Sequence, residues 1–266
     1  MHRDQEPYRE LHQAMFDYEG SGLAEDVVLP WARAHAEERR WFAALAAVRA
    51  TTVPAMAIED RWRLYAMGRI CELLRLGFTR RAGHDAGWQL SVPAAAYAEF
   101  MAAFGFERVT QAEFHPFFHE VVTVAQAADE DAPPGVLAEA WPGHMLGPLL
   151  FARAGCHVAA GRRHLVKDIA EGSTLYWAYA RNNRPVHDLS QGWGSNSQWR
   201  TALRRDYAIA GELHYNVDAD PSRPPDEDGL APADWRELVR HRCFVRCAER
   251  HDERFPYDRS HREPQP

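Results

Sequence analysis

Two histidines and two glutamates stand close together in the chain, at Glu113, His115, His119 and Glu120. If the segment is helical, His115 and His119 share one face, because residues four apart have Cβ atoms about 6 Å apart. Two imidazoles at that spacing can hold one divalent metal ion such as iron or zinc, and a neighbouring carboxylate adds an oxygen ligand. The pattern therefore suggests a metal site formed by His115, His119 and Glu120, with Glu113 as an alternative carboxylate.

Pro116 stands between the two histidines and weakens the helical interpretation. Proline is tolerated only in the first turn of a helix, so a helix here would begin near His115, which would then serve as its cap. In the competing interpretation the neighbouring phenylalanines belong to the core, and the two histidines fill polar corners around them.

The segment 187–200 is the most polar stretch of the chain. Ser195 and Gln198 have the spacing of a capping box, which predicts a helix that begins at Asn196. On that helix a buried stripe would follow at four-residue intervals, formed by Trp199, Leu203 and Tyr207.

Gly192 and Gly194 precede this expected helix. They leave backbone N–H groups accessible at its N-terminus, where a phosphate or carboxylate binds well. We therefore expect a site for a small polar or anionic molecule, with these binding residues: Trp193, Ser195, Asn196, Gln198 and Arg200. The alternative is an ordinary capped helix whose glycines supply positive φ angles.

Lys167, Glu171 and Asp188 are the candidate catalytic groups, as acids, bases or fixed charges. That role requires burial, because a low-dielectric environment shifts the pKa values of such groups. Lys167 and Glu171 are also four residues apart. A surface helix turn with an ion pair worth about a few tenths of a kcal/mol is therefore the simpler interpretation.

The periodicity of apolar residues predicts a helical first half. Helices are expected over 31–50, 60–76 and from a cap at Ser91 to Phe104, where Gly105 ends the last one. In the second half, residues 149–159 and 173–181 have the aromatic and small residues of strands. Residues 241–247 alternate with period two, so a strand is possible there, and so is a helix that continues from Trp235.

These elements predict an α+β fold in which a helical N-terminal half packs on a mixed, strand-containing C-terminal half. The expected regions are 1–126, mainly helical, 137–248, which is mixed and contains the polar loop at 187–200, and a polar tail at 249–266. An acidic stretch rich in proline and glycine at 127–135 is the best candidate linker. We expect the whole chain to form one compact unit with a frayed tail.

The composition excludes several classes of protein. The formal net charge of −7 argues against a nucleic-acid binder, which needs a basic surface to displace counterions. The chain has no apolar leader and no run of about 20 apolar residues, so we expect a cytoplasmic protein outside the membrane. Lys167 is the only lysine among 31 basic residues, a bias that suggests a bacterial genome rich in G and C.

Three functions fit these patterns. The first is an enzyme acting on a small polar or anionic substrate, with or without a metal ion at the His/carboxylate cluster, and hydrolysis and oxygen chemistry are both open. The second is a non-catalytic protein-binding module, an inhibitor or immunity-type partner with an aromatic and arginine surface. The third is a ligand-sensing domain that binds an anion at residues 187–200.

Overall fold

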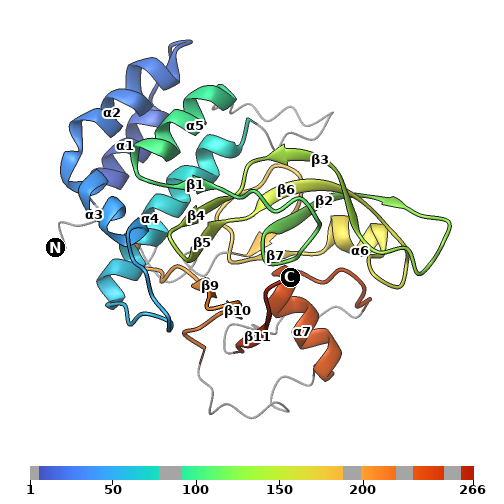
Figure 1. Ribbon diagram of the computed structural model, residues 1–266. Coiled ribbons are helices and arrows are strands. Elements are labelled where there is room, and N and C mark those ends of the chain that lie inside the picture. Colours follow the sequence, from blue (N-terminus) through green and yellow to red (C-terminus); the bar gives the residue numbers. More distant parts are fainter. Residues whose placement is uncertain (1–5, 78–91, 188–198, 220–229, 249–258) are drawn as a thin grey trace. The chain divides into compact units, whose positions relative to one another are not determined.

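The computed structural model of this chain describes residues 6–77, 92–187, 199–219, 230–248 and 259–266 (Figure 1). The chain divides into two compact units. The helical unit comprises Met1–Arg49, Pro54–Glu107 and Trp177–Leu203. The sheet unit comprises Ala50–Val53, Arg108–Tyr176 and Arg204–Pro266. The mainly N-terminal helices and mainly C-terminal strands confirm the α+β class.

The helical unit contains a π-helical segment, five α-helices and one short strand among its described residues: α1 (Glu6–Phe16), η2 (Ala24–Val28), α2 (Leu29–Ala34), α3 (Ala36–Ala46), α4 (Ile58–Arg75), α5 (Ala94–Ala103) and β8 (Val186–His187). The apolar period expected over 60–76 is present in α4, which buries Leu64, Met67 and Ile70 completely. Gly105 has a φ of +79° just after α5, which confirms the expected end of that helix.

The helix expected over 31–50 is divided in two. His35 lies between α2 and α3 with φ −95° and ψ +62°, outside the helical region. Its Nδ1 lies 2.8 Å from the carbonyl oxygen of Trp31, and the two rings stack with centroids 4.3 Å apart. A side chain bound to the backbone four residues earlier competes with the helical hydrogen bonds at that point.

The sheet unit contains the remaining elements: β2 (His119–Gln126), β3 (Gly135–Trp141), β4 (His144–Leu146), β5 (Leu149–Ala152), β6 (Ala154–Ala160), α6 (Lys167–Gly172), β7 (Leu175–Tyr176), β9 (Asp206–Ile209), β10 (Glu212–Tyr215), α7 (Pro232–His241) and β11 (His261–Pro264). The short strand β1 (Glu107–Arg108) lies at the boundary between the units. One sheet has the order β1-β4-β5-β9-β10-β11 and another the order β2-β6-β3.

In the three-stranded sheet, β6 pairs parallel with β2 and antiparallel with β3, and α6 lies beside β2 (Figure 1). Residues 127–134 therefore connect two strands of one sheet. A separate core cluster includes Phe117, Leu213, Tyr215 and Val239, so the segment before β2 packs with β10 and α7. This packing therefore brings together three segments of the sheet unit that are far apart in the sequence.

Four expectations about local structure are wrong. Residues 173–181 contain only the two-residue strand β7. The stripe of Trp199, Leu203 and Tyr207 is not helical, because Tyr207 belongs to β9. Residues 241–247 are neither strand nor helix beyond His241, since Arg242 takes a left-handed conformation with φ +60° and ends α7. The tail is not frayed at 261–264, which pair with β10 from Tyr215↔His261 to Glu212↔Pro264.

Within the described ranges, every helix is too short or too polar to cross a membrane.

Candidate functional site

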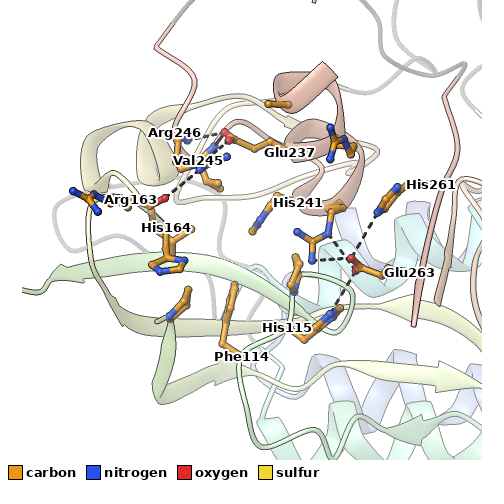
Figure 2. A pocket seen from close by; sticks show the side chains of 16 residues that line it. Phe114, His115, Arg163, His164, Glu237, His241, Val245, Arg246, His261 and Glu263 are labelled. Carbon is orange, nitrogen blue, oxygen red and sulfur yellow. Dashed lines mark hydrogen bonds and ion pairs between the residues drawn. The ribbon is translucent and has the colours of Figure 1, made fainter. Parts of the chain in front are cut away.

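The sheet unit contains a cavity of about 610 Å³ (Figure 2). Five segments that are far apart in the sequence line it: residues 114–116 before β2, residues 163–165 after β6, one face of α7, residues 245–246, and β11. Pro134 adds one more contact from the loop between β2 and β3. We call this cavity the α7 pocket.

Helix α7 contributes a stripe with helical spacing to the α7 pocket, made of Ala233, Arg236, Glu237, Arg240 and His241. Residues three and four apart lie on one face of a helix. Its other face carries Leu238 and Val239, which are completely buried. The same periodicity that docks α7 on the core therefore turns its cationic residues toward the cavity.

Glu237 binds residues 245–247, which follow α7 and include part of the pocket lining. Its Oε1 accepts hydrogen bonds from the backbone N–H groups of Val245 and Arg246, both at 2.6 Å, and from that of Cys247 at 3.1 Å. Its Oε2 accepts one from Arg246 Nε at 3.0 Å. The hydrogen bonds of this buried carboxylate are therefore satisfied by residues 245–247, and it presents little free charge to the cavity.

Glu263 in β11 is the second carboxylate of the pocket. It accepts a hydrogen bond from Tyr215 Oη at 2.5 Å, and its Oε2 lies 3.0 Å from Arg240 Nη2. His115 Nε2 lies 3.5 Å away and His261 Nε2 3.6 Å away. Burial alone would raise the pKa of Glu263, but the hydrogen bonds from His261 and Tyr215 and the charge of Arg240 outweigh it and lower the pKa to about 2.

The pocket has more positive than negative groups. Among its described lining residues are four arginines and two glutamates, a formal excess of two positive charges when the histidines are neutral. Arg163 pairs with Asp131 at 2.9 Å, and Arg240 and Arg246 pair with the two glutamates. Arg236 is exposed, donates from Nε to the carbonyl oxygen of Pro232, and has no carboxylate partner among the described residues. Its charge is available to a ligand.

His241 differs from the other three histidines of the pocket. The rings of His115, His164 and His261 all contact a polar partner at one nitrogen. The ring nitrogens of His241 make no hydrogen bond to any described residue, and its ring lies nearly parallel to that of Phe114, at an angle of 22°. Figure 2 places it in the middle of the lining residues.

The environment of His241 keeps its ring neutral. Burial, and then the positive charges of Arg240, Arg153 and Arg246, lower its pKa well below the ordinary value. A neutral imidazole has one N–H donor and one acceptor nitrogen. It is therefore able to give or accept a hydrogen bond when a ligand enters.

A buried cluster of guanidinium groups lies behind His241. Arg153 Nη1 donates to the carbonyl oxygen of His241 at 2.5 Å, and Arg204 and Arg242 pair with Asp206 at 2.8 and 2.9 Å. Burial lowers the pKa values of Arg153 and Arg204 to about 10, although nearby carboxylates act in the opposite direction. The cluster adds positive potential to the back of the pocket.

The expected metal residues do not have the arrangement that the helical interpretation required. Residues 115–118 form a turn and His119 begins β2, so the helical geometry assumed for His115 and His119 is absent. His119 Nδ1 accepts a hydrogen bond from the His115 backbone N–H at 2.9 Å, and Glu120 pairs with Arg153 at 3.4 Å. No three His, Cys, Asp or Glu side chains in the described part of the chain are placed to share one metal ion.

Lys167 and Glu171 form the ion pair that their spacing indicated, with Nζ and Oε1 2.5 Å apart. Glu171 Oε1 also accepts a hydrogen bond from the Val124 N–H at 2.8 Å, and Lys167 Nζ donates to the Val124 carbonyl at 3.3 Å. The pair thus caps the backbone of β2, next to a register shift between Val121 and Thr123. Neither residue lines the α7 pocket.

The candidate catalytic residue Asp188 lies outside the described residues. So do most of the expected substrate-binding residues: Trp193, Ser195, Asn196 and Gln198. Arg200 is described. It is an exposed residue of the helical unit, and its guanidinium carbon lies 5.8 Å from the centroid of the Trp62 ring. Among the candidate site residues that the structure describes, only His115 lines the α7 pocket.

The sequence contained one signal for this pocket, the spacing of Arg236, Arg240 and His241 on a helix that begins at Pro232. No pattern among neighbouring residues of the sequence indicated that this stripe would lie beside His115 or Glu263.

Comparison with known proteins finds no matching family model, no matching curated sequence and no matching solved structure.

Proposed function

We propose that this protein binds a small anionic molecule in the α7 pocket. The observation that supports the proposal is a difference between the acidic and the basic side chains that line the pocket. Both glutamates are satisfied by protein groups, while Arg236 has no carboxylate partner and His241 no ring hydrogen bond among the described residues. Open cationic and hydrogen-bonding groups beside satisfied carboxylates favour a ligand that brings its own negative charge.

The electrostatics support this choice. Two opposite charges 4 Å apart attract by about 1 kcal/mol in water and about 4 kcal/mol near a protein surface. The chain as a whole is acidic, with net charge −7, so an excess of positive charge in its pocket is a local feature. The buried guanidinium cluster behind His241 strengthens the same potential.

A catalytic role is the second candidate, and it rests on His241. A neutral imidazole in a pocket is able to accept a proton from a bound substrate or from water, which is the work of a general base. This candidate keeps the enzyme hypothesis suggested by the sequence and gives the role of general base to His241 in place of Asp188 or Glu171. The reaction that such a general base would catalyse depends on which ligand the pocket binds.

The test is a calorimetric titration of the full chain with phosphate and with citrate. We expect Arg236→Gln to weaken binding about tenfold or more, because a charge-assisted hydrogen bond is worth about 1.5–3 kcal/mol. The matched control is Arg262→Gln, which removes the same charge from an exposed residue of β11 that does not line the pocket. Equal weakening by both variants, or no binding by the unaltered chain, contradicts the proposal.

A further inference from the structure

We propose that the ligand of the α7 pocket is an organic anion, a carboxylate or phosphate monoester whose apolar body lies against Phe114 and Pro134, and not an inorganic ion. This inference rests on the proposed function and specifies its ligand class. It follows from the size of the cavity, the distribution of its lining and the pairing of its arginines.

The cavity is too large for an inorganic anion. A water molecule takes up about 30 Å³, and a phosphate ion, with its five non-hydrogen atoms, occupies only a few times that volume. The α7 pocket measures about 610 Å³, within the range of about 300–1,000 Å³ in which proteins enclose small organic ligands. A phosphate alone would leave most of the cavity to solvent.

The two sides of the lining differ in chemistry. The side formed by α7 and β11 carries charged and polar groups, among them His241 and Glu263 (Figure 2). Arg236 of α7 also lines the cavity. The loops before β2 and between β2 and β3 contribute Phe114, Pro116 and Pro134. A ligand with a charged end and an apolar body matches both sides at once.

The apolar side is held in place before a ligand arrives. The Phe114 ring stacks with two imidazoles, with His119 at 5.7 Å and 23° and His241 at 6.4 Å and 22°. Pro134 has a fixed φ angle. A wall that is already ordered loses little conformational entropy when a ligand binds.

The charge state of the ligand is limited by the arginines. Three of the four guanidinium groups in the described lining already have carboxylate partners, and only Arg236 does not. One open guanidinium matches one anionic group. The pocket therefore fits a ligand with a single acidic group better than a polyphosphate or another polyanion.

The experiment is a calorimetric titration of the full chain with four probes: inorganic phosphate, phenyl phosphate, benzoate and benzyl alcohol. We expect phenyl phosphate to bind about tenfold or more tightly than inorganic phosphate, because its ring is removed from water. We also expect benzoate to bind and benzyl alcohol to show no binding, because the anionic group is required.

Phe114→Leu tests the apolar wall. It should reduce the preference for phenyl phosphate over phosphate to less than about threefold. The control is Leu137→Ala, which removes a side chain that is 62% exposed and outside the pocket, and circular dichroism verifies that both variants are folded.

Phosphate binding as tightly as phenyl phosphate would overturn the organic-anion inference and leave the proposed function standing. An unaltered chain that binds neither phosphate nor any other anion among the probes would overturn both.

Discussion

Arg240 and Glu263 lie 3.0 Å apart and join the last turn of α7 to the strand β11. The two residues are far apart in the sequence, and each lines the same cavity. Glu263 binds Tyr215 of β10 at the same time, so one carboxylate links the helix to two strands. The shape of the α7 pocket therefore depends on this contact.

Glu263→Gln should lower the free energy of unfolding by about 1–3 kcal/mol, because Arg240 and Tyr215 each lose a charged partner at a partly buried position. Chemical denaturation measures this difference. Glu212→Gln is the matched control, since Glu212 lies on the neighbouring strand β10 with an exposed side chain, 3.4 Å from His214. Equal losses in the two variants would show that Glu263 has no special structural role.

The acid stability of the protein should depend on Glu263. Its pKa is lowered from 4.5 to about 2 on folding, so the carboxylate stabilises the native state fully above pH 4.5. That contribution is lost as the pH falls from about 4.5 to about 2. Unfolding free energy measured across this range should fall less steeply in Glu263→Gln than in the unaltered chain. Parallel curves would contradict the prediction.

His12 should make the helical unit sensitive to pH in a higher range. Burial, and then the charge of Arg69, lower its pKa from 6.5 to about 4, and no described residue hydrogen-bonds to its Nε2. Below pH 6.5, His12 binds a proton in the unfolded chain but stays neutral in the folded chain. The free energy of unfolding therefore falls by about 1–3 kcal/mol between pH 6.5 and about 4.

The matching variant is His12→Phe, which keeps a ring to stack on Phe16, whose centroid lies 4.4 Å from that of His12. It should lose less stability between pH 6.5 and 4 than the unaltered chain does, as followed by thermal unfolding at several pH values. A slope as steep as before would show that His12 is not the titrating group.

Gly155→Ala should disrupt the three-stranded sheet. A Cβ atom at this position of β6 would lie 2.2 Å from the Trp141 ring, which is almost completely buried. Overpacking of this kind costs about 1–3 kcal/mol or more. Gly135→Ala is the control, because a Cβ there meets nothing within 4 Å. Denaturant unfolding of the two variants should differ by at least about 1 kcal/mol.

Glu171→Gln separates a structural role from a catalytic one. The side-chain oxygen that accepts from Val124 is kept, and the ion pair with Lys167 is lost. Because 48% of the Lys167 side chain is exposed, we expect a loss of no more than about 1 kcal/mol of stability and an affinity for phosphate within about twofold of the unaltered chain. A large fall in phosphate affinity would show that Glu171 belongs to the functional site after all.

The sequence by itself determined the local features of this protein. Apolar residues at helical spacing located α4, and Gly105 marked the end of the helical stretch before β1, because both signals depend only on neighbouring residues. The run at 149–159 was identified as strand for the same reason and forms β5 and β6. The i, i+4 pair of Lys167 and Glu171 was also readable, since a single helical turn brings the two together.

Only the tertiary structure decided where the α7 pocket lies. His115, His241 and Glu263 meet because β11 pairs with β10 and because Arg242 ends α7 in a left-handed conformation. These arrangements depend on contacts between residues far apart in the chain, which periodicity does not report. The polar tail was misinterpreted for this reason: its four paired residues gain their order from the edge of a distant strand, and not from apolar residues of their own.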